Sequence, residues 1–290
     1  MVMATGRHPP ASCSDESVRR LPDFVVIGAM KAGTTSFHSY LGEHPEICMS
    51  RMKDANFFSP RHAWEKGSAW YRALFTDHSK LLGETSAGYS QHPSVPDVPR
   101  NIASFNPSAK IIYLVRDPVR RILSHYAHNV AQGREKRSVD EALKNLRSNH
   151  YINCSRYFMQ LRQYLEFFDE SQILVLTSEA LADRRPAALG RTFRFLGVDD
   201  RFTARSFDQV LHQSVKLRRN TVLGDVLDRL PLLRRLKSRI PLAGRRLAAP
   251  KLNEPLERRL AQSLHEDVSA LESFTGEDYQ AWTTFRRAVS

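Results

Sequence analysis

The chain has 290 residues, of which 41% are hydrophobic and 26% are charged, a balance typical of one globular domain. Its longest apolar runs, 24–30 and 111–115, are too short to cross a bilayer. The formal net charge of +12 at pH 7 favours acidic partners, but no zinc-finger, RNP-type or helix-turn-helix pattern accompanies it, so we expect no nucleic-acid partner.

The N-terminal residues are polar and contain no apolar stretch of the kind found in a signal peptide. We predict a disordered tail over residues 1–20 and one folded domain over residues 21–290. The three cysteines, Cys13, Cys48 and Cys154, have neither disulfide-framework nor metal-ligand spacing. We therefore expect free thiols in a reducing compartment and a soluble protein of the cytoplasm.

Strand and helix patterns alternate along the predicted domain. Apolar runs bounded by turn residues predict strands at 24–28, 81–84, 110–115 and 173–176, and helices at about 34–41, 68–74, 102–105, 118–132, 138–147, 155–169 and 186–196. Strands that are apolar on both faces and separated by helices indicate a parallel sheet. The expected fold is a single α/β domain whose central parallel sheet is flanked by helices on both faces.

The turn after the first predicted strand has the composition of an anion-binding loop. Gly28 and Gly33 have the G-x-x-x-x-G spacing of a P-loop, and a Thr-Thr-Ser run follows at 34–36, where a helix begins. Backbone N–H groups and a helix N-terminus then point at one spot, which suits an anion. A nucleotide P-loop holds its lysine directly after the second glycine, whereas here it lies inside the loop, at Lys31. The loop is therefore P-loop-like, and its lysine is expected to reach a different atom of the ligand. The alternative is a glycine turn that only packs against the sheet.

A second anion site is predicted where the strand 110–115 ends. Arg116 follows that strand, at the edge where open α/β sheets bind their ligands. Asp117 and Pro118 favour the start of a helix, which carries Ser124 two turns later. Arg116 and Ser124 are thus placed to hold one anion between them, with the guanidinium donating two parallel hydrogen bonds. The alternative is an ion pair between Arg116 and Asp117.

Together, the two motifs resemble those of the sulfotransferases that use 3′-phosphoadenosine 5′-phosphosulfate (PAPS). K-A-G-T-T-S at 31–36 is similar to the 5′-phosphosulfate-binding loop of that family, and R-D-P-V-R-R-I-L-S-H-Y at 116–126 is similar to its 3′-phosphate-binding motif. K-D-A-N-F-F at 53–58 and G-E-T-S-A-G-Y at 83–89 resemble the heparan-sulfate-type branch and its bacterial relatives. The resemblance covers about residues 22–282, and it implies a P-loop-like loop that binds phosphosulfate.

The resemblance implies transfer of a sulfuryl group from PAPS to an acceptor, with 3′,5′-ADP as the second product and without a metal ion. Lys31 would stabilise the charge that develops on the bridging oxygen as the S–O bond breaks, which lowers the barrier itself. Arg116 and Ser124 would hold the ribose 3′-phosphate. The 5′-phosphosulfate would be held by the loop and the first helical turn, which comprise Lys31, Ala32, Gly33, Thr34, Thr35 and Ser36.

The general base is expected in the K-D-A-N-F-F stretch. The heparan-sulfate-type branch usually carries a glutamate where this chain has Asp54, so the resemblance assigns the base to a carboxylate that is one methylene shorter. Glu84 is the alternative base. Lys53, next to Asp54, would lower the pKa of that carboxyl or contact the sulfonate. His38 and His125 are expected to be structural or to lie beside the cofactor.

The strongest concentration of positive charge is at residues 201–250, which carry twelve Lys or Arg and three Asp or Glu. In relatives, a loop at the position of Lys216, Arg218 and Arg219 closes over the 3′-phosphate, so the resemblance adds these residues to the donor site. We expect this loop to be mobile without nucleotide. Leucines alternate with Arg and Lys over 227–247, which favours short amphipathic helices. These helices would cover the sheet or form a patch for peripheral membrane contact.

Two other functions are compatible with parts of the sequence. A P-loop-like nucleotide kinase or NTPase would use 110–115 as its Walker B strand, although the position of Lys31 disfavours this assignment. A non-catalytic polyanion-binding protein would use the basic residues at 201–250. For a sulfotransferase, the sequence leaves open the oligomeric state and whether the acceptor is a small molecule, a glycan or a glycolipid with a hydroxyl or an amine.

Overall fold

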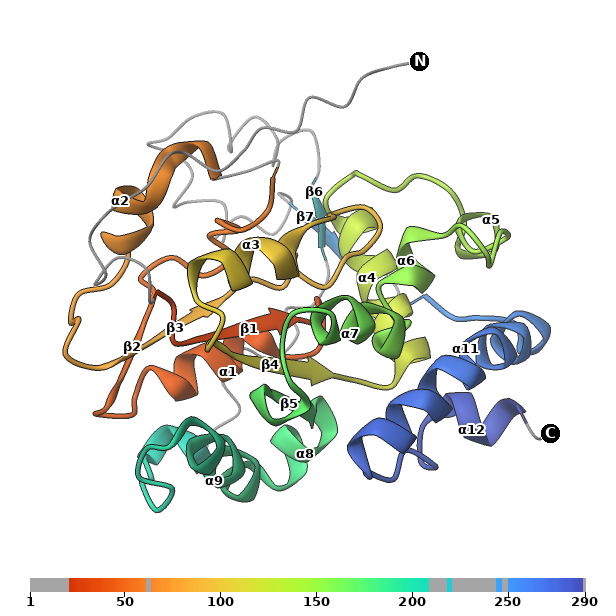
Figure 1. Cartoon of the computed structure of the whole chain (residues 1–290). Helices are drawn as coiled ribbons and strands as arrows, with labels where there is room; N and C mark the ends of the chain where they lie inside the picture. Colours follow the sequence, from red (N-terminus) through yellow and green to blue (C-terminus); the bar gives the residue numbers. More distant parts are fainter. Residues whose placement is uncertain (1–20, 61–63, 209–217, 221–243, 247–249, 289–290) are drawn as a thin grey trace.

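Figure 1 shows a computed structural model of the chain, which describes residues 21–60, 64–208, 218–220, 244–246 and 250–288. At its centre is a five-stranded parallel sheet with the strand order β2-β3-β1-β4-β5. The strands are β1 (Phe24–Gly28), β2 (Ile47–Met49), β3 (Leu81–Thr85), β4 (Lys110–Val115) and β5 (Ile173–Thr177). The predicted α/β fold with a central parallel sheet is confirmed.

The two central strands are apolar along their length because both of their faces are covered. All five residues of β1 and the last five of β4 are buried, and β1 pairs with β3 on one side and with β4 on the other. The four predicted strands agree with the structure to within one residue. β2 is not predicted from the sequence, because three residues are too few to show a period.

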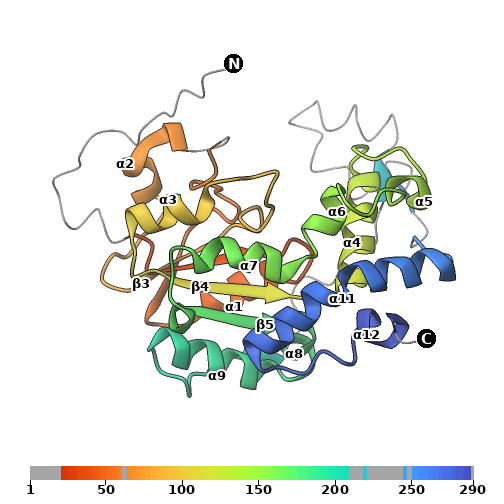
Figure 2. The same ribbon diagram turned by 45° about the vertical axis from the view of Figure 1, so that its right-hand side comes forward.

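Helices cover both faces of the sheet, as predicted (Figures 1 and 2). One face carries α3 (Val98–Phe105) and α7 (Tyr157–Leu165), and the other carries α1 (Thr34–Leu41), α8 (Ser178–Asp183) and α9 (Arg185–Leu196). The short helix α2 (Gly67–Arg72) lies towards the β2 and β3 side of the molecule. α9 ends at Gly197, whose left-handed backbone (φ 84°) closes the helix as its position predicts.

The structure corrects the prediction of one helix over 138–147. α5 covers only Val139–Ala142, and another short helix, α6, covers His150–Asn153. Between them, the side chain of Asn145 accepts two hydrogen bonds, of 3.0 and 3.3 Å, from backbone N–H groups of the following residues and turns the chain. The side chain of Asn149 then caps α6.

The helices α4 (Pro118–Ala131), α11 (Glu254–Thr275) and α12 (Thr283–Ala288) lie beyond the carboxyl ends of the strands in Figure 1. The side chain of Asp117 accepts hydrogen bonds from the N–H groups of Val119 and Arg120 and caps α4, as predicted. α11 packs against α4 and α7, and its Asp267 accepts two hydrogen bonds from the first turn of α7. Among the helices that the structure describes, none combines the length and apolar character needed to span a membrane.

The basic residues at 201–250 are described only in part. β6 (Arg218–Asn220) pairs in antiparallel fashion with β7 (Gly244–Arg246), and β6 lies beside α4. The predicted helices over 227–247 are therefore wrong at residues 244–246, because an antiparallel partner holds these residues in a strand. The rest of that segment, the predicted tail at 1–20 and Lys216 lie outside the described residues.

Candidate active site

The loop between β1 and α1 requires glycine at both ends. Gly28 has φ 148°, and a Cβ there would lie 2.1 Å from Ser90 Oγ, so a larger residue does not fit. Gly33, with φ 93°, leads into α1. Lys31 has φ 75°, which is uncommon for a residue other than glycine and is enriched at functional sites. The loop therefore holds Lys31 in a left-handed conformation at its centre.

The N-terminus of α1 is suited to an anion. Gly33 supplies no side-chain cap, and the first turn contains no acidic residue. The N–H groups of a first helical turn carry partial positive charge and need acceptors, which a bound phosphate or sulfate provides. Thr34 is buried, Ser36 is half-buried and Thr35 is exposed, so hydroxyl groups lie at several depths around this turn.

Arg116 lies against the loop that carries Lys31. β4 is the neighbour of β1, so the residue after β4 meets the end of β1. The Nη1 group of Arg116 donates a 3.2 Å hydrogen bond to the carbonyl oxygen of Lys31. The pKa of Lys31 is lowered, chiefly by burial and also by the charges of Arg116 and Lys53. The structure thus brings the two predicted anion motifs together and gathers three cations around one loop.

Asp117 does not neutralise Arg116. Its Oδ1 atom caps α4, and its Oδ2 atom accepts hydrogen bonds of 2.9 and 2.7 Å from the backbone N–H and the hydroxyl of Thr283. Among the residues that the structure describes, the cation within 4 Å of this carboxylate is Arg120, at 3.9 Å. Ser124 lies on α4 and is half-buried. The alternative in which Asp117 takes Arg116 as its ion-pair partner is therefore wrong.

A second arginine, which the sequence analysis misses, also holds the loop. Arg121 is fully buried and donates hydrogen bonds to the carbonyl oxygens of Met30 (3.3 Å) and Tyr151 (2.5 Å) and to Ser155 Oγ (2.5 Å). Its partners in the described structure are neutral, so its charge adds to the positive potential of the loop. The sequence signal for its burial was its place on the helix face that also carries His125, four residues later.

Asp54 follows β2 in the chain and lies beside the last residue of β3, where its carboxylate is accessible. Its backbone N–H donates to the carbonyl oxygen of Thr85 at 2.8 Å, and its left-handed conformation (φ 58°) turns the chain. Oδ1 accepts a 2.9 Å hydrogen bond from the N–H of Ala87, and Oδ2 accepts one of 2.5 Å from Lys53 Nζ. The side chain of Asp54 is 45% exposed. The charge of Lys53 also lowers the pKa of Lys31. Because Lys53 pairs with Asp54, the Asp54 carboxylate lies near the loop.

Glu84, the alternative base, lies in the core. Its side chain is fully buried and accepts hydrogen bonds from three hydroxyls: Tyr71 (2.6 Å), Ser86 (2.6 Å) and Tyr89 (2.8 Å). Burial raises the pKa of Glu84, and the three hydrogen bonds lower it. Ser86 Oγ in turn accepts a hydrogen bond from the N–H of Asn56. Through Ser86, Glu84 is thus linked to the Asp54 turn, and its carboxylate is not exposed to solvent.

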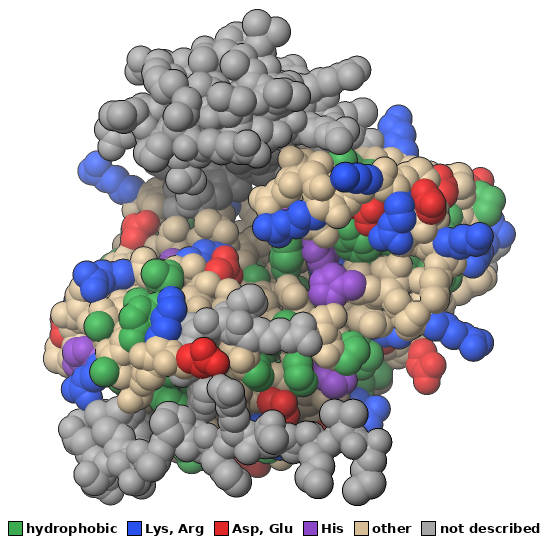
Figure 3. Space-filling model, turned by 90° about the horizontal axis from the view of Figure 1, so that it is seen from above, with side chains coloured by type: hydrophobic (Ala, Val, Ile, Leu, Met, Phe, Trp, Pro, Cys, Tyr) green, Lys and Arg blue, Asp and Glu red, His purple; other side chains and the backbone are tan. Residues whose placement is uncertain are grey.

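Histidines lie next to the same loop and are neutral at pH 7. Burial, together with the charge of Arg121, lowers the pKa of His125 to about 2. Burial and the charge of Lys53 lower the pKa of His38 to about 4. The pKa of His128, which the sequence analysis does not consider, is lowered by burial and then by Lys31. Figure 3 shows histidine side chains near the middle of one face of the molecule, with Lys and Arg side chains around them.

Other residues that the sequence predicts to bind PAPS are less well described. Arg218 and Arg219 belong to β6, beside α4, and only the path of their backbone is described. Among the described residues, no cluster of three or more His, Cys, Asp or Glu is arranged to hold a metal ion. The candidate site therefore consists of the Lys31 loop, Arg116 and Arg121 behind it, and the Asp54 turn beside it.

Comparison with known proteins matches residues 21–220 to the model of the sulfotransferase domain family. The bifunctional heparan sulfate N-deacetylase/N-sulfotransferase 1 of Caenorhabditis elegans is 27% identical over 207 residues, which are 66% of this chain and 24% of that protein. The human heparan sulfate glucosamine 3-O-sulfotransferase 3A1 is 27% identical over 211 residues, 69% of this chain and 50% of that protein. The chain thus spans between a quarter and half of the length of these relatives.

Among solved structures, a sulfotransferase from Alicyclobacillus acidocaldarius is similar in fold, with a TM-score of 0.67 and 24% identity. The match covers 90% of this chain and 98% of that one. The helices α11 and α12 follow the residues that the family model matches.

Proposed function

The chain belongs to the sulfotransferase domain family, and from this premise we propose that it transfers a sulfuryl group from PAPS to a hydroxyl or amine of an acceptor. The observation that carries the proposal is the hydrogen bond from Arg116 to the carbonyl oxygen of Lys31. It joins a loop that suits the 5′-phosphosulfate to a strand end that suits the 3′-phosphate, and PAPS carries both groups. The relatives cited above are named as sulfotransferases, which supports the same reaction.

The proposed reaction is an in-line displacement. The acceptor atom forms a bond to sulfur while the bond between sulfur and the bridging phosphate oxygen breaks, so that the bond electrons and the negative charge leave with 3′,5′-ADP. Lys31 stabilises this charge, and because the charge develops in the transition state, the interaction lowers the barrier. A sulfuryl group carries less charge than a γ-phosphoryl group, so a lysine and backbone amides can act where a kinase needs magnesium.

Asp54 is the proposed general base. Its carboxylate is exposed, lies beside the loop and takes the proton of the acceptor hydroxyl or amine as the new bond forms. The N–H of Ala87 holds one carboxylate oxygen and Lys53 the other, so the side chain is oriented before the acceptor arrives. Buried Glu84 is a positioning residue for this turn in the same proposal.

The remaining donor contacts are assigned by motif position. Backbone N–H groups and side chains of the loop and first turn of α1 hold the 5′-phosphosulfate, Ser124 joins Arg116 on the 3′-phosphate, and the segment with Lys216, Arg218 and Arg219 contributes further cations. The acceptor is a glycan, a glycolipid or a small molecule. Two relatives named for heparan sulfate support a glycan. A cytoplasmic location stays a prediction from the sequence.

Nucleotide binding by the full chain tests the donor. In calorimetry, 3′,5′-ADP is expected to bind at least tenfold more tightly than 5′-AMP, because only 3′,5′-ADP can engage Arg116. Magnesium ATP is expected to bind more weakly than 3′,5′-ADP. The reverse preference would overturn the assignment of the donor and favour a nucleotide kinase or NTPase.

Transfer is tested with PAPS that carries labelled sulfate and a fractionated cell extract, followed by mass analysis of the labelled product. Label in an extract component that depends on the protein is the expected result. Tight binding of 3′,5′-ADP without transfer to any fraction would instead favour a non-catalytic polyanion-binding protein.

A further inference from the structure

A cavity of about 850 Å³ opens between the 137–149 segment and α11, apart from the Lys31 loop. Its lining residues are Arg137, Glu141, Ala142, Lys144, Asn145, Leu146, Arg147, Ser148, Asn149 and Arg259. In Figure 1, α5, α6 and α11 lie beyond the carboxyl ends of the strands, on the side of the sheet where the glycine loop also lies. None of these lining residues takes part in the proposed transfer.

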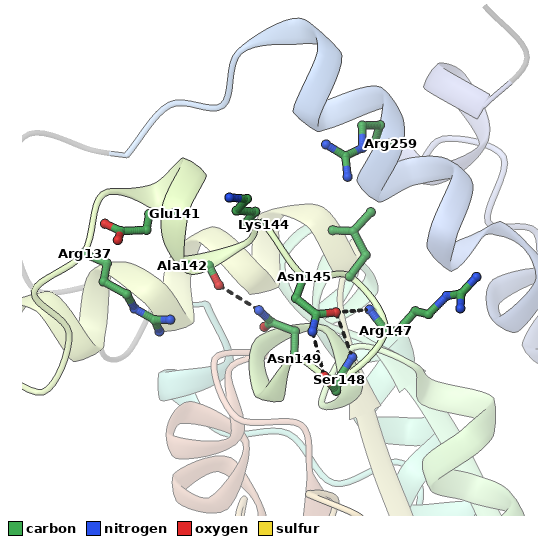
Figure 4. Close-up of a pocket in the computed structure, with 10 residues that line it drawn as sticks. Arg137, Glu141, Ala142, Lys144, Asn145, Arg147, Ser148, Asn149 and Arg259 are labelled. Atoms are coloured by element: carbon green, nitrogen blue, oxygen red, sulfur yellow. Dashed lines mark hydrogen bonds between the residues drawn. The ribbon is translucent and has the colours of Figure 1, made fainter.

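The cavity is rich in cations without partners. Arg137 is held by Glu135 through two hydrogen bonds of 2.9 and 2.7 Å. By contrast, the side chains of Lys144, Arg147 and Arg259 are exposed and have neither a hydrogen bond nor an ion pair with any residue that the structure describes. In Figure 4, Arg259 reaches from α11 towards the loop, Lys144 lies across from it, and the carboxylate of Glu141 points away from both. Cations that line one cavity favour an anion there.

The side chains of Asn145 and Asn149, which are neutral and polar, form hydrogen bonds within the segment that lines the cavity. Asn145 accepts two backbone N–H groups and donates to Ser148 Oγ at 2.8 Å. Asn149 donates to the carbonyl oxygen of Ala142 at 2.7 Å and accepts the N–H of Tyr151. The loop is thus braced by its own side chains. Recognition of a ligand is left to the three cations.

The lining also limits the chemistry of the ligand. Ala142 and Leu146 are its two apolar residues, and it contains no aromatic side chain. A lipid chain or an aryl group binds where apolar walls cover it, so neither suits this cavity. A hydrophilic molecule with several anionic groups does, because each sulfate or carboxylate can pair with a lysine or arginine.

We propose that this cavity is a second anion-binding subsite, which holds sulfate or carboxylate groups of a hydrophilic, sugar-like acceptor through Lys144, Arg147 and Arg259. The assignment rests on the proposed function only in calling the ligand the acceptor. The cavity and the donor site share a structural link, since α6 follows the cavity loop directly and the carbonyl oxygen of its Tyr151 accepts a hydrogen bond from Arg121, which also holds Met30.

The test measures binding of sucrose octasulfate to the full chain by calorimetry, with 3′,5′-ADP at saturation so that the donor site is blocked. Unsulfated sucrose is the uncharged control. The variant with Lys144→Gln, Arg147→Gln and Arg259→Gln is expected to bind the octasulfate at least tenfold more weakly than the unmutated protein. Its affinity for 3′,5′-ADP is expected to be unchanged.

A matched variant separates this site from the general positive charge of the protein. Arg162→Gln, Arg201→Gln and Arg205→Gln remove the same charge from exposed positions outside the cavity, and we expect less than a threefold change. Equal losses in the two variants, or no binding of octasulfate by the unmutated protein, would overturn the subsite. Displacement of the octasulfate by millimolar inorganic sulfate would indicate a site for a small free anion and overturn the sugar-like ligand. Failure of 3′,5′-ADP to bind would count against the proposed donor. The octasulfate result would still show whether the cavity binds anions.

Discussion

The hydroxyl of Tyr157 donates a 2.7 Å hydrogen bond to the carbonyl oxygen of Arg116. Tyr157 is fully buried at the start of α7, and its ring packs edge-on against Trp282, just before α12. Thr283, the next residue, holds the side chain of Asp117. The start of the C-terminal helix α12 therefore helps to hold Arg116 and Asp117, the two residues that follow β4. More than 100 residues separate these two parts of the chain in the sequence.

Tyr157→Phe is expected to weaken 3′,5′-ADP binding about three- to tenfold, because a hydrogen bond of this kind contributes about 0.5–1.5 kcal/mol and here positions Arg116. The affinity for 5′-AMP, which lacks the 3′-phosphate, should not change. Tyr164→Phe is the matched control, since that hydroxyl donates to the carbonyl oxygen of Tyr89 from the same helix. Equal effects of both variants on 3′,5′-ADP would show that Tyr157 has only a structural role.

Lys31→Ala is expected to lower the rate of sulfuryl transfer by about 10²–10³-fold or more, because it removes stabilisation of the leaving group. The affinity for 3′,5′-ADP should stay within a few fold of the unmutated value. Single-turnover rates and calorimetry measure the two effects separately. Lys80→Ala, at an exposed lysine that pairs with Asp77, controls for loss of charge. A wild-type transfer rate in the Lys31 variant would remove this residue from the mechanism.

Arg116→Ala is expected to reduce the affinity for 3′,5′-ADP by about 2–4 kcal/mol, since it leaves a phosphate without its charged partner. Arg120→Ala, one turn along α4 and with its side chain 61% exposed, is the control and should have little effect. The affinity for 5′-AMP should fall much less than that for 3′,5′-ADP. If the affinities for both nucleotides fell by the same factor, Arg116 would act only by holding the loop through the carbonyl oxygen of Lys31, and not by binding the 3′-phosphate.

Asp54→Asn is expected to lower turnover by about 10²–10⁴-fold with little change in PAPS affinity, because the amide has nearly the same shape but cannot take a proton. Glu84→Gln is the comparison. It should lower the melting temperature, since the amide of glutamine cannot accept all three hydroxyls as the carboxylate does. If the folded Glu84 variant lost turnover and the Asp54 variant retained it, the assignment of the base would be wrong.

Asp267→Asn is expected to change how stability depends on pH. Burial raises the pKa of Asp267 to about 6, and the N–H groups of Phe158 and Met159 offset this only in part. A carboxyl whose folded-state pKa is raised stabilises the fold below its unfolded pKa of about 4, and this contribution is lost as the pH rises through about 6. The free energy of unfolding of the asparagine variant, relative to the unmutated protein, should therefore increase between pH 4 and pH 7, by up to about 3 kcal/mol. Urea titrations at both pH values measure it, and a difference that does not depend on pH would contradict the shift.

The central strands and the anion loop could be predicted because their signals are local. β1 and β4 are runs of apolar residues with both faces covered, and the two glycines of the loop, Gly28 and Gly33, have positive φ angles that favour glycine. The predicted helix over 138–147 is wrong because the side chain of Asn145 accepts two backbone N–H groups and turns the chain. Short elements such as β2 and α6 give too little pattern to detect.

The sequence by itself determined the fold class, the loop with an internal lysine and the family, because these depend on residues close together in the chain. Only the tertiary structure showed which of the two candidate carboxylates is exposed, since Asp54 lies at the surface and Glu84 is buried by hydroxyls from distant segments. It also showed that Arg121 and Tyr157 donate hydrogen bonds to the Lys31 loop and to Arg116, and that Lys144 and Arg259 line one cavity. The physical reason is that burial, hydrogen-bond partners and electrostatic neighbours depend on contacts between segments far apart in sequence, and no local pattern records them.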